Sequence, residues 1–211
     1  MKLYHYMDAA AYRSLNENGY VIGSPEHSTF PDFAEAYAWL ADVMADRIGP
    51  APQHAHPRWP VFSWHLHNGL DPVAYDAVME YEDKTGLLVG FDVPDDLCVL
   101  SDFDDWHYIL NGWYLPTYGV DEPSADKECE DFDARCKTAG YDLWTPPAKG
   151  PDPDVERMRR KNWKRVVDYP TANGSVQATT WELRLDWMFF VRVRNRDGLD
   201  LHPRQMSLLA L

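Results

Sequence analysis

The chain has 211 residues, of which 45% are hydrophobic and 26% charged, a composition typical of one globular domain. Its formal net charge of −14 argues against a domain whose main work is sequence-independent nucleic-acid binding, because such binding needs a positive surface that faces the phosphates. No apolar run approaches the roughly 20 residues of a membrane span, and MKLYHYMDAA lacks the apolar core of a signal peptide, so we expect no membrane association.

The first elements are set off by clear capping residues. Lys2–Met7 is predicted to be a strand, and Asp8 is predicted to cap a helix over Ala9–Asn18. Gly19 ends this helix, because glycine readily adopts the left-handed conformation that closes helices. Residues 20–23 then predict a second, short strand.

A stronger helix is expected next. Ser28, Thr29, Pro31 and Asp32 open it, and apolar residues recur near every fourth position until Gly49 stops it. The residues of this apolar face are Phe33, Tyr37, Leu40, Met44 and Ile48. A proline-rich loop follows over residues 51–60, and the alternation in residues 61–67 predicts a half-buried strand.

The middle of the chain predicts two strands and a short helix. Residues 86–93 and 97–100 are the strands, and residues 106–110 begin the helix. Asp102 is placed to cap that helix, with the following acidic residues favoured by its N-terminal dipole.

The last third of the chain alternates charged and apolar segments. Residues 121–133 are expected to form an acidic connection, and residues 154–168 a surface helix with a basic face. Residues 176–185 and 189–194 show strand alternation. Strands in several clusters with interspersed helices predict a single α+β domain over residues 1–211, with a mixed, mainly antiparallel sheet and flanking helices.

The number and spacing of the cysteines indicate the redox compartment in which the protein is expected. The three cysteines, Cys98, Cys129 and Cys136, form no CxxC or other metal-binding spacing. An odd number suits a reducing compartment better than a disulfide scaffold. We therefore expect a cytoplasmic protein.

Four sequence blocks are specific as a set: MKLYHYM, FAEAYAWLADVMADRIG, LSDFDDWHYILNGWYLP and VQATTWELRL. They resemble successive blocks of a bacterial and phage family, the domain of unknown function 3841, and the resemblance spans nearly the whole chain. The first strand of that family usually reads Leu-Trp-Thr-x-Gln, from which Tyr4-His5-Tyr6-Met7 departs. The family supplies no activity that this resemblance could carry over.

The order of elements also resembles, more weakly, the ADP-ribosyltransferase superfamily. In that superfamily an early strand carries a His or Arg for the NAD ribose, and a late strand carries a catalytic Glu. His5 and Glu182 stand on strands in this order. The resemblance implies an ADP-ribosyltransferase-like fold that binds NAD as its substrate and transfers ADP-ribose to an acceptor that the sequence does not identify.

The resemblance implies roles for five residues. Glu182 is the expected catalytic carboxylate, because departure of nicotinamide leaves an oxocarbenium-like ribose that a carboxylate stabilises. His5 is expected to hydrogen-bond the adenosine-side ribose, and Tyr37 to stack on nicotinamide. Gln177 and Trp181 are expected to be pocket residues beside Glu182.

Structural roles for the same residues stay open. His5 also fits a partly buried strand histidine bound to a backbone group, and Glu182 fits a carboxylate paired with Arg184 or Arg192. The opposing functional class is a non-enzymatic binding protein, in which the aromatic block over residues 106–114 forms a ligand pocket or a partner surface. The enzyme requires Glu182 and His5 to meet in one cleft, which separates the two classes.

Two HxH pairs suggest a metal site as an alternative. These are His54-Ala-His56 and His65-Leu-His67, and the second pair is expected on one face of a strand. Such ligands suit zinc, iron or manganese. Loop histidines are usually solvated, so no metal ligand is assigned.

The basic run over residues 157–165 has two interpretations. Its arginines and lysines provide charge-assisted hydrogen bonds to a phosphate-bearing ligand. In an acidic chain they also provide partners for the acids of residues 121–133, and we expect that internal pairing.

Overall fold

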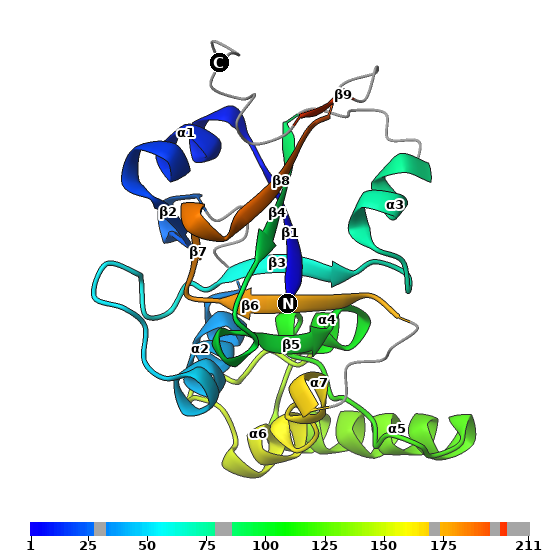
Figure 1. Cartoon of the computed structure of the whole chain (residues 1–211). Helices are drawn as coiled ribbons and strands as arrows, with labels where there is room; N and C mark the ends of the chain where they lie inside the picture. Colours follow the sequence, from blue (N-terminus) through cyan, green and yellow to red (C-terminus); the bar gives the residue numbers. More distant parts are fainter. Residues whose placement is uncertain (28–32, 79–85, 169–173, 195–198, 202–211) are drawn as a thin grey trace.

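Two antiparallel sheets organise the computed structural model, which describes residues 1–27, 33–78, 86–168, 174–194 and 199–201. Its strands are β1 (Lys2–Met7), β2 (Tyr20–Ile22), β3 (Val61–Leu66), β4 (Leu87–Asp92), β5 (Val99–Asp102), β6 (Val176–Thr180), β7 (Glu182–Arg184), β8 (Met188–Val193) and β9 (Leu199–Leu201). Seven form a sheet in the order β5-β6-β3-β1-β4-β8-β9, while β2 and β7 form a second sheet (Figure 1).

Seven α-helices lie in the described ranges: α1 (Ala9–Asn18), α2 (Ala34–Ile48), α3 (Pro72–Val78), α4 (Phe103–Leu110), α5 (Glu122–Ala139), α6 (Pro153–Arg160) and α7 (Arg165–Asp168). Short 3₁₀ turns occur at Pro25–His27, Asp95–Leu97 and Leu185–Trp187. None of these described helices is long and apolar enough to cross a membrane. The α+β class is confirmed, and every strand pair in the described ranges is antiparallel, so the expected mixed character is not observed there.

The large sheet has two arms that meet between β1 and β3. β1 pairs with β4 from Lys2 to Met7, but it pairs with β3 only at Tyr4 and Trp64. Figure 1 shows β3, β6 and β5 running across the direction of β1, β4 and β8. The junction between the arms lies beside α1, β2 and the end of the loop that leads into β3.

The first core cluster lies between the large sheet and α1. Leu3 and Met7 point from β1 to the same side and are buried there with Tyr12 and Leu15 of α1. The Asp8 carboxylate caps α1 by accepting a hydrogen bond from the Ala11 amide at 2.7 Å. The predicted strand and helix are therefore confirmed, and they place His5 between two core residues.

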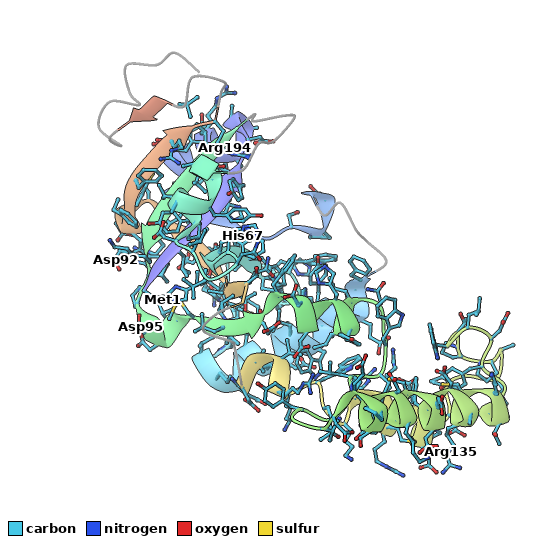
Figure 2. All side chains as sticks on the ribbon, turned by 90° about the vertical axis from the view of Figure 1, so that its right-hand side faces the viewer. Met1, His67, Asp92, Asp95, Arg135 and Arg194 are labelled. Atoms are coloured by element: carbon cyan, nitrogen blue, oxygen red, sulfur yellow. The ribbon has the colours of Figure 1, made fainter. Side chains whose placement is uncertain are left out.

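Two further clusters bury the remaining helices. The second packs α2, α4 and α7 around Leu40, Trp106 and Trp163. The third is small and joins α5 to α6 through Phe132 and Val155. Figure 2 shows α5, which carries Arg135, at the end of the molecule away from Arg194.

The acidic segment 121–133 is helical, so its prediction as a connection was wrong. Asp121 caps α5 by accepting a hydrogen bond from the Ser124 amide at 2.9 Å. Phe132 and Cys136, four residues apart, are buried on one narrow stripe, and Gly140 closes the helix in a left-handed conformation. The acidic residues occupy the solvent side, which hid the short apolar stripe in the sequence.

The basic segment 154–168 forms two helices, α6 and α7, instead of one. Between them Trp163 turns into the core, where it is 1% exposed. The described arginines pair with acids other than those of residues 121–133: Arg157 with Asp154, Arg159 and Arg160 with Glu35 and Glu156, and Arg165 with Asp105. These arginines therefore do not make the predicted pairing with residues 121–133. Within that segment, the Tyr114 hydrogen bond and the nearby charge of Lys161 lower the pKa of Glu128, so the pairing is limited to this one contact among the described residues.

Residues 176–185 also divide into two strands instead of one. The chain leaves β6 at Thr180 and enters β7 at Glu182, and the two strands belong to different sheets. β7 then pairs with β2, so that Glu182 lies opposite Ile22. Because of this change of sheet, Glu182 lies beside β2 and not beside the strands of the large sheet.

An exposed turn at Leu143 and Trp144 supplies a first prediction. Both residues have positive φ angles, 45° and 67°, and the flanking Asp142 and Thr145 exchange two backbone hydrogen bonds. Such two-residue turns favour Asn-Gly, because other side chains are strained there. Leu143→Asn is expected to raise the free energy of unfolding by about 0.5–1 kcal/mol, measured by urea denaturation. Leu143 is 86% exposed, so no buried contact is lost, and a loss of stability would contradict the assignment of strain.

Candidate functional site

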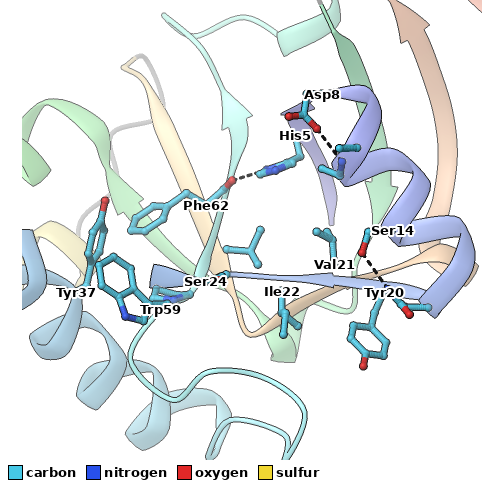
Figure 3. Close-up of a pocket in the computed structure, with 16 residues that line it drawn as sticks. His5, Asp8, Ser14, Tyr20, Val21, Ile22, Ser24, Tyr37, Trp59 and Phe62 are labelled. Carbon is cyan, nitrogen blue, oxygen red and sulfur yellow. Dashed lines mark hydrogen bonds between the residues drawn. The ribbon is translucent and has the colours of Figure 1, made fainter. Parts of the chain in front are cut away.

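An open pocket of about 890 Å³ lies at the junction of the sheet arms, within the size range of small-molecule sites. Its walls come from β1, α1, β2, α2 and the loop that enters β3 (Figure 3). The lining residues used below are His5, Tyr20, Ile22, Tyr37, Trp59 and Phe62. The lining also includes the polar residues Asp8, Ser14, Asn18 and Ser24, so the pocket combines aromatic and polar walls.

His5 presents a fixed tautomer to the pocket. Its Nδ1 lies 2.7 Å from the carbonyl oxygen of Phe62, and a carbonyl only accepts, so Nδ1 carries the proton. Burial lowers the pKa of His5 below its usual 6.5, although the Phe62 hydrogen bond acts in the opposite direction. The ring is therefore neutral at pH 7, and its Nε2 is a hydrogen-bond acceptor. The expected backbone partner of His5 is confirmed.

Tyr37 forms an aromatic wall of the same pocket. Its ring centroid lies 4.9 Å from that of Trp59 and 5.7 Å from that of Phe62. Burial raises the pKa of Tyr37, so the phenol stays protonated. Figure 3 shows Tyr37 and Trp59 side by side at one end of the pocket. A planar ring in a ligand would find aromatic faces here.

Glu182 lies outside the pocket lining but next to it. It is opposite Ile22 in the β2–β7 pair, and directly opposed residues have neighbouring side chains. Its Oε2 lies 2.7 Å from Nε2 of His54, and its Oε1 lies 3.9 Å from Nη1 of Arg184. The His54 ring packs against Tyr20 at 4.4 Å between centroids. Glu182 and His5 therefore do not line one pocket, and the contacts of the Glu182 carboxylate are with His54 and Arg184.

Gln177 and Trp181 are placed away from the pocket. Gln177 lies on β6 between its pairing partners Trp64 and Ser101. Trp181 is 7% exposed, and its indole N–H donates to the carbonyl oxygen of Gly49 at 2.9 Å. Neither lines the pocket, because the chain changes sheets between these residues and Glu182.

The four histidines of the HxH pairs have separate surroundings. His56 accepts a hydrogen bond from the Arg58 amide, and Nδ1 of His65 lies 3.2 Å from the Lys2 carbonyl oxygen. The His67 ring lies between Trp64 and Tyr75, with centroid distances of 4.1 and 3.5 Å. A register shift between Trp64 and Leu66 disturbs the alternation expected there. Across the ranges that the structure describes, no three His, Cys, Asp or Glu side chains group as metal ligands.

The aromatic block 106–114 contributes mainly to the core. Trp106, Ile109 and Tyr114 are buried, and the Tyr114 hydroxyl donates to Glu128 at 2.7 Å. Asp102 caps α4 as predicted, accepting hydrogen bonds from two following amides. His107 is exposed and bound to a backbone carbonyl of its own helix. Within this block, Trp106 contacts the pocket residues Tyr37 and Phe62, with ring centroids 6.4 and 5.7 Å apart.

Comparison with known proteins gives the family of the chain. The model of the domain of unknown function DUF3841 matches residues 2–189. The chain belongs to this family. The DUF3841 match extends from β1 into β8, so it includes every wall of the pocket and the His54–Glu182 pair. No curated protein and no solved structure matches the chain.

Proposed function

We propose that this DUF3841 protein binds NAD, or a related nucleotide, in the pocket and acts on it as an ADP-ribosyltransferase-like enzyme with an acceptor still to be identified. One observation carries the proposal: His5 and Tyr37, from β1 and α2, line the same pocket. A ribose and a planar base need a hydroxyl-binding group and an aromatic face close together. The pocket offers both.

The His5 geometry supports ribose binding in particular. A neutral ring whose Nδ1 proton is held by the Phe62 carbonyl offers Nε2 as an acceptor for a ligand hydroxyl. The same hydrogen bond restricts rotation of the ring, so less freedom is lost on binding. Tyr37 and Trp59 supply the faces on which the nicotinamide ring can stack.

Glu182 supports the transferase chemistry less directly. Its carboxylate is 14% exposed and stands one strand pairing away from Ile22 of the pocket wall. From there it can act on the reaction at the pocket edge, either at the ribose or through His54. The proposal of NAD binding depends on His5 and Tyr37, and that of transfer depends on Glu182.

Calorimetric titration with NAD tests the binding proposal. The wild-type chain is expected to bind NAD, and His5→Ala to weaken binding about fivefold, because one hydrogen bond contributes about 1 kcal/mol. Tyr37→Leu keeps the apolar helix face but removes the stacking ring, and it is expected to weaken binding as well. A parallel assay follows nicotinamide release, which Glu182→Gln is expected to lower about tenfold or more.

His107→Ala is the matched control. This histidine also bonds through Nδ1 to a backbone carbonyl, but it lies outside the pocket. Thermal melting of each variant separates a loss of binding from a loss of folding. The proposal would be contradicted if the wild type showed neither heat of binding nor nicotinamide release at about 1 mM NAD. It would also be contradicted if His5→Ala and the wild type bound NAD with equal affinity.

A further inference from the structure

We infer that His54 and Glu182 form a proton-transfer dyad at the edge of the pocket. His54 is the catalytic base that takes the proton of an incoming hydroxyl nucleophile, and Glu182 is a positioning residue that orients the imidazole. The inference rests on the proposed function, because the electrophile is the NAD ribose. It names His54, which the sequence suggested only as a metal ligand, as the group that handles the proton.

The contact between the two side chains defines the tautomer of His54. An ionised carboxylate only accepts hydrogen bonds, so the 2.7 Å contact makes Nε2 the donor to Oε2 of Glu182. In the neutral ring Nδ1 then keeps its lone pair. A carboxylate bound to one nitrogen of an imidazole, with the other nitrogen free to take a proton, is the arrangement that general bases use.

A second basic group lies near the carboxylate. Its second oxygen lies 3.9 Å from Nη1 of Arg184, and the Nε of Arg184 donates to Asp186 at 3.0 Å. Leu183, between Glu182 and Arg184, is fully buried in the first core cluster. The backbone of β7 is therefore fixed by packing, and Glu182 points away from the core.

The dyad adjoins the pocket lining through Tyr20. The His54 ring packs on Tyr20, and both Tyr20 and Ile22 line the pocket. Figure 3 shows Tyr20 and Ile22 on the same side of β2, opposite Val21. Because Glu182 is the cross-strand neighbour of Ile22, the dyad lies on the Tyr20 and Ile22 side of β2, at the edge of the pocket away from His5. His54 is 40% exposed, so a nucleophile can reach it from solvent.

The chemical step balances with these groups alone. The oxygen of the nucleophile forms a bond to C1′ of the ribose as the bond from C1′ to nicotinamide breaks. The bonding pair leaves with the nicotinamide nitrogen, which becomes neutral. The nucleophile's proton passes to Nδ1 of His54, and Glu182 stabilises the imidazolium that forms.

The test compares two nucleophiles, water and azide. Water must lose a proton during attack, whereas azide is an anion and needs no base. Nicotinamide release is measured for the wild type, His54→Gln, Glu182→Gln and His56→Ala, in buffer and in buffer with sodium azide. His54→Gln is expected to lower release with water about 100-fold and to leave release with azide within about twofold, because general bases contribute about 10²–10⁴-fold.

The variants distinguish the role of His54 as the base from the role of Glu182 as the positioning residue. Glu182→Gln is expected to lower release with water about tenfold and to spare azide, since the amide holds His54 but does not stabilise its charge. Unchanged activity of His56→Ala, the other histidine of the loop pair, supports specificity. Equal loss with both nucleophiles in His54→Gln overturns the dyad, because that pattern indicates damage to the pocket. Loss with azide in Glu182→Gln overturns its positioning role and places the carboxylate on the ribose.

Failure of the proposed function is distinguishable from failure of the dyad. No release from the wild type with either nucleophile overturns NAD chemistry and this step with it. Release that His54→Gln leaves unchanged overturns the dyad alone. Nitrogen NMR of the neutral His54 ring gives a readout without NAD: a proton on Nε2 supports the dyad, and a proton on Nδ1 overturns it.

Discussion

Gly23→Ala is expected to destabilise the protein by about 2–3 kcal/mol and to reduce ligand binding in the pocket. An added Cβ would lie 2.8 Å from the carbonyl carbon of Trp59 and 2.9 Å from the carbonyl oxygen of Pro60. Both neighbours are backbone atoms, so β2 or the entry to β3 must shift, and overpacking of this kind typically costs about 1–3 kcal/mol. Gly23, Trp59 and Pro60 all line the pocket, so the shift changes its shape.

The measurement pairs urea unfolding with NAD titration of the same variant. Gly119→Ala is the matched control, because Gly119 has a φ of 79° and nothing within 4 Å of an added Cβ. It is expected to cost about 1 kcal/mol through backbone strain alone and to leave binding unchanged. Equal effects of the two substitutions would show that the close approach at Gly23 is not rigid.

Local signals in the sequence were sufficient to predict β1 and α1. Asp8 and Gly19 mark both ends of a helix with side-chain and backbone chemistry that acts over three or four residues. The same kind of signal also marked α3, which the sequence analysis missed. There the Asp71 carboxylate accepts a hydrogen bond from the Val73 amide, and Pro72 starts the helix. Short helices with one cap are hard to separate from turns.

The helix α5 was not predicted, because its many charged residues obscure the short apolar pattern. α5 buries little beyond Phe132 and Cys136, so its sequence looks like a solvated connection. The break between β6 and β7 was hidden for a different reason. Both halves alternate, and only the pairing of β7 with β2 shows that they belong to different sheets.

The candidate site combines predicted residues with one unforeseen partner. His5 and Tyr37 were named singly, and the fold brings them to one pocket. His54 and Glu182 are 128 residues apart, and their contact depends on the register of β2 against β7 and on the course of the loop before β3. A single amino-acid sequence contains no local signal for such a pair. From the sequence, His54 was therefore considered only as a metal ligand and not as a catalytic base.

Asp76→Ala is expected to destabilise the protein by about 3–5 kcal/mol, because it removes the carboxylate of a buried ion-pair cluster. Asp76 is 3% exposed on α3, and its oxygens lie 3.0 Å from Nε of Arg194 and 3.5 Å from Nη1 of Arg192. Both arginine side chains are only 12% exposed. Without Asp76 the two guanidinium groups lose this carboxylate inside the protein, where solvent compensates poorly.

The cluster also attaches α3 to β8 of the large sheet. Arg192 donates to the Val73 carbonyl at 3.1 Å, and the Arg194 guanidinium lies 4.5 Å from the centre of the Tyr6 ring. Urea unfolding measures the effect, with Asp154→Ala as the control, because that exposed partner of Arg157 should contribute less than about 1 kcal/mol. Similar losses in both variants would mean that the Asp76 cluster is solvated, and α3 would then be held by its apolar contacts alone.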